Sequence, residues 1–146
     1  MDLRRDACLI GGCWVTGDAW IDVDDPATGE VIGRVPALGA AETRAAIAAA
    51  AAAMPAWAAR PAKDRAVVLR RLHDLMIEHQ EPLARLLTAE QGKPLTEARG
   101  EIAYAAAFLE WFGEEAKRVY GEIVPAHRAD TRIMVLRQPV GVVAAI

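Results

Sequence analysis

Two cysteines and two of the three histidines in this sequence are suited to nucleophilic, redox or metal chemistry. Cys8 and Cys13 lie five residues apart across a Gly-Gly pair, as in a redox pair or half of a metal site. No further Cys or His lies nearby to complete a ligand set, so we interpret both as small apolar strand residues. His73 and His79 could be ligands or bases. They lie in an amphipathic helical pattern without a carboxylate-rich cluster, which favours surface or boundary positions.

Length and composition favour one domain with a core of its own. The chain has 146 residues, of which 53% are hydrophobic and 25% charged, and its formal net charge is -3. This charge gives no basic field for nucleic acid, and no apolar stretch approaches the roughly 18 residues that a membrane span requires. The first residues lack the apolar core of a secretory signal. We therefore expect a cytoplasmic protein with neither nucleic acid nor a membrane as partner.

The N-terminal 35 residues are predicted to form antiparallel strands. Apolar runs flank Gly11-Gly12, a pair that suits a tight type I′ hairpin turn. A second hairpin is predicted from the runs WIDV and EVIGRV, which are joined by residues 24–29 with Pro and Gly at turn positions.

Helices are predicted from residue 40 onward. An alanine-rich helix is expected from Ala40 to about Met54, with Glu42 in its first turn, and Pro55 and Pro61 are each expected to begin a new helical segment. An amphipathic helix is predicted over 63–79. A short helix restarts at Pro82 and ends at Gly92.

The clearest helical pattern lies over residues 95–119. Its apolar positions step by three and four: Leu95, Ala98, Ile102, Ala105, Leu109, Phe112, Ala116 and Val119. A coiled coil is the alternative, but the alanines in this seam favour close packing inside a globular body.

The last residues form two apolar runs. The run TRIMVLRQ, residues 131–138, is predicted to be a strand paired on both sides. The run VGVVAAI, residues 140–146, is typical of a central parallel strand covered on both faces. A parallel neighbour needs a crossover that does not follow in this sequence. We therefore expect a truncated chain whose strand neighbours are encoded elsewhere.

Three stretches carry a family resemblance: DPATGEVIGRVP, EQGKPLTEARGEIAYAAAFLEWFGEEAKRVYGEIVPA and QPVGVVAAI. They resemble the N-terminal part of NAD(P)-dependent aldehyde dehydrogenases, and are most similar to the succinate-semialdehyde dehydrogenase group. The resemblance implies an α/β, Rossmann-like fold, of which residues 1–146 form the N-terminal portion of the cofactor-binding domain. It also implies that residues 131–138 match the strand joining the oligomerisation arm.

The resemblance implies an oxidoreductase that converts a small aldehyde, with succinate semialdehyde expected, to the acid with NAD or NADP. The family uses a thiolate nucleophile, hydride transfer and hydrolysis of a thioester. The nucleophilic Cys, the Glu base and the oxyanion Asn match no residue of this chain, and neither Cys8 nor Cys13 matches the nucleophile. The isolated chain is therefore expected to be inactive, with the remainder of the enzyme or further copies as partners.

Site roles carried over by resemblance are few. Ile146 matches a cofactor-contacting residue at the end of the first Rossmann strand, although a core role is the alternative. Ala103 and Ala107 match positions bordering the substrate tunnel, although small residues at this spacing also serve packing.

One metal role is also carried over. Glu90 matches an acidic position that in some members binds a structural monovalent cation, together with backbone carbonyls around Val23 and Asp24. The alternative is a solvated carboxylate at a helix end.

A function from another class stays open. The helix over 95–119 and the strand over 131–138 could form a non-catalytic interaction module, because exposed apolar surface favours association. The reading frame after Ile146 would separate the two hypotheses.

Overall fold

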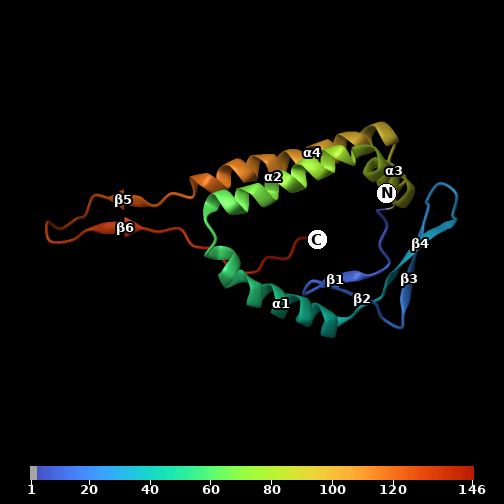
Figure 1. The fold of residues 1–146 in the computed structure, drawn as a ribbon, viewed down its shortest axis with the longest axis horizontal. Coiled ribbons are helices and arrows are strands. Elements are labelled where there is room, and N and C mark those ends of the chain that lie inside the picture. Colours follow the sequence, from blue (N-terminus) through green and yellow to red (C-terminus); the bar gives the residue numbers. More distant parts are fainter. Residues whose placement is uncertain (1–2) are drawn as a thin grey trace.

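The computed structural model describes residues 3–146 as three antiparallel strand pairs and four α-helices (Figure 1). The strands are β1 (Cys8–Ile10), β2 (Cys13–Val15), β3 (Trp20–Asp24), β4 (Val31–Pro36), β5 (Glu122–Val124) and β6 (Ile133–Val135). The helices are α1 (Ala40–Ala58), α2 (Ala62–Glu78), α3 (Gln80–Gln91) and α4 (Leu95–Glu115), and a 3-10 turn, Ala116–Arg118, follows α4. Strand β1 pairs with β2, β3 with β4, and β5 with β6.

Both predicted N-terminal hairpins are confirmed. Gly11 and Gly12 have φ values of 58° and 85° between β1 and β2, as a type I′ turn requires. Between β3 and β4, the Ala27 backbone N–H donates to Asp25 Oδ1 at 2.8 Å, and Gly29 takes a φ of 73°.

The alanine-rich helix α1 is longer than its sequence predicts. It begins as expected, because Glu42 Oε2 accepts the backbone N–H of Gly39 at 2.8 Å. The prediction that Pro55 begins a new segment is wrong, since α1 continues through it to Ala58. Pro55 removes only one backbone donor, and the carbonyl left without it, on Ala51, lies at an exposed position where water can bind.

Helices α2, α3 and α4 pack against one another as a unit (Figure 1). Its buried side chains are all alanines: Ala66, Ala84, Ala98 and Ala106. Gly113 of α4 is also buried, and a Cβ there would lie 3.6 Å from the Cβ of Leu69 in α2. Small residues at these positions allow the helices to approach closely.

The buried line of α4 differs in part from the predicted seam. Ala98 is buried and Leu109 half-buried, as predicted, but Ala105 and Phe112 are exposed. Ala106 is fully buried in place of Ala105. The helix turns 100° per residue. Apolar residues spaced by three and four therefore define an apolar side of the helix, but they do not decide which of two adjacent residues, such as Ala105 and Ala106, faces the partner helix.

A left-handed glycine at the end of α3 lies against the second hairpin. Gly92 ends α3 as predicted, with a φ of 77° and its N–H donating to the Thr88 carbonyl at 2.8 Å. A Cβ at Gly92 would lie 2.9 Å from Pro26 Cγ in the β3–β4 turn. A glycine is therefore required here both by conformation and by close approach.

The two C-terminal apolar runs form less sheet than predicted. Strand β6 is shorter than the predicted 131–138 and pairs only with β5 among the described residues. Residues 139–146 have no helix or strand structure, so the predicted parallel strand is not formed within the described chain. Val140 is 93% exposed and Val143 73% exposed. A strand exists only with a hydrogen-bonded neighbour, and no described segment supplies one.

The molecule exposes much more surface than a compact protein of its size. Its accessible surface is 10980 Å², whereas a compact monomer of its mass exposes about 7300 Å². The excess includes many large apolar side chains on α1, α4 and the C-terminal segment. The described residues therefore present apolar surface that is suited to contact with other protein surface.

Candidate functional site

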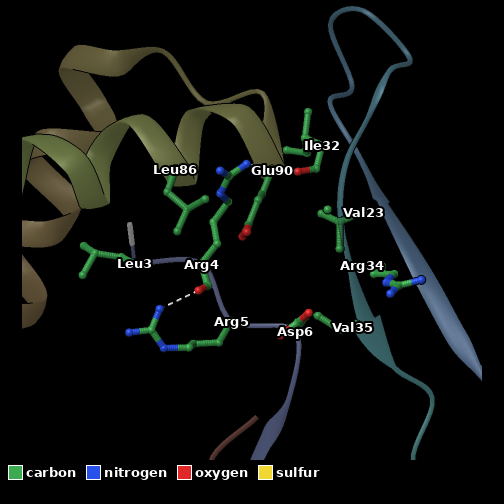
Figure 2. A pocket seen from close by; sticks show the side chains of 11 residues that line it. Leu3, Arg4, Arg5, Asp6, Val23, Ile32, Arg34, Val35, Leu86 and Glu90 are labelled. Atoms are coloured by element: carbon green, nitrogen blue, oxygen red, sulfur yellow. Dashed lines mark hydrogen bonds between the residues drawn. The ribbon is translucent and has the colours of Figure 1, made fainter. Parts of the chain in front are cut away.

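Glu90 lines a pocket of about 470 Å³ between the N-terminal segment, the β3–β4 hairpin and the end of α3 (Figure 2). The pocket is lined by Leu3, Arg4, Arg5, Asp6, Val23, Ile32, Gly33, Arg34, Val35, Leu86 and Glu90. The fold thus brings Glu90 and Val23 together, as the predicted cation site requires, but Asp24 is not among the lining residues.

The charges of this pocket do not fit an added metal cation. Among the described residues, three arginines and two carboxylates line it, so the formal charge of these side chains is already positive. A bare cation needs several oxygen ligands and is repelled by guanidinium groups nearby. Within residues 3–146 there is also no group of three or more His, Cys, Asp and Glu side chains that could hold a metal ion.

A second candidate site is an aromatic face on α4. Tyr104 and Phe108 meet edge to face with ring centroids 4.9 Å apart, and Phe108 stacks on Phe112 at 6.4 Å. Together with Ala107 and Trp111 these side chains line a shallow apolar pocket of about 280 Å³. Each of the four aromatic side chains is at least 46% exposed, so the face is open to a ligand or another protein surface.

The two predicted substrate-lining alanines differ in position. Ala107 lies in the aromatic pocket, whereas Ala103 is half-buried and is not among its lining residues. Sequence reasoning missed the aromatic residues around Ala107. Their signal was present, because Tyr104, Phe108 and Trp111 follow one another at steps of four and three on one helix face.

The predicted cofactor-contacting residue, Ile146, is not part of a pocket described above. Ile146 lies in the segment without regular structure and is fully exposed. An aliphatic side chain has no hydrogen-bonding group for a phosphate or a ribose. The described residues around it therefore do not form a dinucleotide site by themselves.

The cysteines and histidines singled out by type have no catalytic arrangement. Cys8 lies opposite Val15 and Cys13 opposite Ile10 in the first hairpin, and neither cysteine is in a disulfide. His73 Nδ1 lies 3.0 Å from Asp74 Oδ1 on α2. His79 connects α2 and α3. These positions agree with structural roles.

Ion pairs fix α4 against the other two helices of its unit. Arg99 Nε lies 2.7 Å from Glu81 Oε2, and Arg70 Nη1 lies 2.7 Å from Glu110 Oε1. The hydrogen bond from Arg99 lowers the pKa of Glu81, with a further contribution from nearby positive charge. These contacts hold the helix that carries the aromatic face.

Comparison with known proteins identifies the family. The model of the "Aldehyde dehydrogenase family" matches residues 14–146. A glutarate-semialdehyde dehydrogenase of Pseudomonas aeruginosa is 62% identical over 146 residues, which cover 99% of this chain and 30% of that relative. The NADP(+) succinate-semialdehyde dehydrogenase of Escherichia coli is 57% identical over 148 residues, again over 99% of this chain and 30% of the relative.

A solved structure agrees with the sequence matches. The crystal structure of succinate-semialdehyde dehydrogenase from Burkholderia pseudomallei superposes with a TM-score of 0.91 at 54% identity, covering 94% of this chain and 29% of that one. The chain therefore belongs to the aldehyde dehydrogenase family and has the partial α/β fold that the sequence predicted. It spans about 30% of the length of the curated relatives it matches.

No helix in the described part of the chain combines the length and apolar character needed to cross a membrane.

Proposed function

We propose that this chain forms the N-terminal part of an oxidoreductase that converts a short semialdehyde, with an aldehyde at one end and a carboxylate at the other, to the corresponding diacid. The observation that carries the proposal is the identity of 62% and 57%, over nearly the whole chain, with glutarate- and succinate-semialdehyde dehydrogenases. These two named substrates differ by one methylene group. Succinate semialdehyde is the substrate that we expect, and glutarate semialdehyde is the closest competitor.

Within this function, the aromatic face of α4 would border the aliphatic part of the substrate. Tyr104, Ala107, Phe108, Trp111 and Phe112 offer apolar surface and no cationic group. A buried carboxylate needs a charged or hydrogen-bonding partner. We therefore assign the methylene chain, and not the terminal carboxylate, to this face, with Ala103 behind it.

The cofactor of the proposed enzyme is NAD or NADP, which would supply the hydride acceptor when bound. The contribution proposed for this chain is a single apolar contact from Ile146. Such a contact excludes water from a neighbouring surface but does not distinguish the two cofactors, because the difference between them is a phosphate.

The isolated chain is expected to be inactive. A thiolate nucleophile requires a nearby base or positive charge, and the strand partners of Cys8 and Cys13 are apolar. We further propose a cytoplasmic location, no role for nucleic acid or membrane, and partners that are the rest of the enzyme or further copies, joined through residues 131–138.

An assay of nicotinamide reduction tests the proposal. The chain is assayed with NAD or NADP and either semialdehyde, alone and mixed with the remaining portion of the Pseudomonas aeruginosa relative. We expect no reduction from the chain alone and aldehyde-dependent reduction from the mixture. The control is the remaining portion by itself. Activity of the chain alone would contradict its inactivity, and failure with every semialdehyde in a correctly assembled mixture would contradict the proposed substrate class.

A second candidate function is a non-catalytic interaction module, favoured by the large exposed surface of the described chain. This hypothesis predicts stable binding to another protein without any restoration of activity. Binding of the chain to the remaining portion of the relative, with no reduction of either nicotinamide, would support it over the enzyme hypothesis.

A further inference from the structure

We propose that the corner where α1 meets α2 is a docking site for an acidic segment of the larger part of the enzyme, the part that lies outside residues 1–146. The inference rests on the proposed function, in which this chain is assembled with that part. It starts from a pocket of about 620 Å³ between the end of α1, the start of α2, the turn after α4 and the segment that follows β6 (Figure 1).

The charges that line this pocket are all positive among the described residues. Arg65, Lys117 and Arg137 come from three separate segments, and no described Asp or Glu lies in the lining. The whole chain carries a formal net charge of -3, so this concentration of positive charge is local. Guanidinium and ammonium groups bind carboxylates through charge-assisted hydrogen bonds. The charges therefore indicate an acidic occupant.

Arg65 lacks a counter-ion in the described chain. It is half-buried, and its Nη1 donates to the carbonyl oxygen of Ala58 at 2.9 Å. That carbonyl satisfies one donor but does not neutralise the charge, and within residues 3–146 Arg65 makes no ion pair with a carboxylate. A partly buried charge is favourable only with an opposite charge nearby. A carboxylate from another protein segment would supply it.

The other two cations have carboxylate partners that a docking segment can replace. Lys117 Nζ lies 3.3 Å from Glu114 Oε2, and Arg137 Nη2 lies 3.8 Å from Glu122 Oε1. The four side chains are about half exposed or more, and such surface pairs contribute little to stability. Exchanging one of them for a pair with a docked carboxylate therefore costs little.

Apolar side chains beside the cations favour a protein segment over a free anion. Trp57 is 42% exposed and Val119 57% exposed, and both line the pocket together with Met54 and Pro139. A free anion would leave this apolar surface in water, whereas a segment with acidic and apolar residues covers both. The accessible surface of 10980 Å² exceeds the compact value of about 7300 Å². This excess is several times the roughly 800 Å² per partner that a stable interface buries.

Charge reversal in the assembled complex tests the proposal. The chain is co-expressed with the remaining portion of the Pseudomonas aeruginosa relative, and the dissociation constant of the purified complex is measured. Lys117→Glu and Arg137→Glu should each weaken the association at least about 5-fold. The matched control is Arg71→Glu, the same charge reversal at an exposed arginine of α2 outside the pocket, which should leave the affinity unchanged.

Salt dependence gives a second measurement that needs no variant. Binding of the unmodified chain should weaken about 10-fold between about 0.1 and about 0.5 M NaCl, because salt screens an acidic segment from the basic pocket. An affinity that Lys117→Glu and Arg137→Glu leave unchanged would overturn the proposal. An affinity that does not fall with salt would also overturn it.

A small anion is the competing occupant of the pocket, and its binding would overturn the proposal. It would appear as a saturable rise of the isolated chain's thermal midpoint with citrate that Arg137→Glu abolishes, together with an unchanged affinity for the remaining portion. Nicotinamide reduction by the same complexes reports the proposed function separately. Full activity with unaltered binding in the variants contradicts the docking site alone. Charge-dependent binding without oxidation of any semialdehyde supports the docking site and contradicts the proposed function.

Discussion

The helical unit α2–α4 and the α1 region differ in what their alanines do. In α2–α4 one set of alanines is buried, and Ala84, Ala98 and Ala106 are completely inaccessible to solvent. Helix α1 is richer in alanine, yet none of its residues is buried. The same residue type thus forms a core in one region and an open surface in the other.

This difference shows that alanine content alone does not indicate burial. In α2–α4 a partner helix lies within reach, and the ion pairs Arg99–Glu81 and Arg70–Glu110 join α4 to α3 and α2. Helix α1 contacts mainly the short strand β1. Stability within the described residues should therefore be concentrated in α2–α4.

The largest effect should follow from placing a charge in the core of that unit. Ala106→Asp buries a carboxylate without a partner between α4 and its neighbours, which should cost about 3 kcal/mol or more of unfolding free energy. The matched control is Ala107→Asp, one residue along at an exposed position, which should cost less than about 1 kcal/mol. Urea denaturation followed by circular dichroism measures both. Equal losses would mean that α4 is not packed as described.

A smaller effect should appear where α3 meets the β3–β4 hairpin. Gly92→Ala forces an alanine into a left-handed conformation and against Pro26, which should cost about 1–2 kcal/mol. Gly100→Ala is the control, because Gly100 lies inside α4 with open space where a Cβ would be. It should instead stabilise the protein by about 0.5–1 kcal/mol. Denaturation midpoints that shift in the same direction would contradict the assignment of Gly92 as a left-handed cap.

The smallest effect concerns the ion pair between α3 and α4. The pKa of Glu81 is lowered from its ordinary value of 4.5, chiefly by the hydrogen bond from Arg99. A lowered pKa in the folded state gives a stabilisation that is present at neutral pH and is lost as the pH falls below about 4.5. Arg99→Gln should therefore flatten the dependence of the thermal midpoint on pH between about pH 5 and about pH 3. Arg71→Gln should leave that dependence unchanged, and a parallel loss in both variants would argue against the pair.

Local signals in the sequence predicted most of the elements. The Gly11-Gly12 turn, the Gly92 cap and the contact of Glu42 with the start of α1 all depend on neighbours a few residues away, and all are confirmed. Pro55 was predicted wrongly as a helix start. The run over 140–146 was predicted as a strand whose neighbours are encoded elsewhere, and it forms no strand within the described residues. The strand requires a partner that is distant in sequence, so a local pattern could not decide whether it forms.

The candidate sites were harder to predict than the elements. Glu90 and Val23 were expected together and do share a pocket, but Arg4 comes from a segment far away in sequence, and no local pattern indicated its position there. Ala107 was proposed by resemblance and lies in the aromatic pocket, whereas the aromatic rings around it were missed because Phe112 was assigned to the buried seam.

The exposed apolar surface has a consequence for how the chain behaves at different concentrations. Folding of a single chain is a first-order process, whereas encounters between exposed apolar faces increase with the square of the chain concentration. A high chain concentration therefore accelerates aggregation relative to folding, and dilution favours folding. Rapid capture by a surface that covers α1 and the aromatic face of α4 would remove this competition.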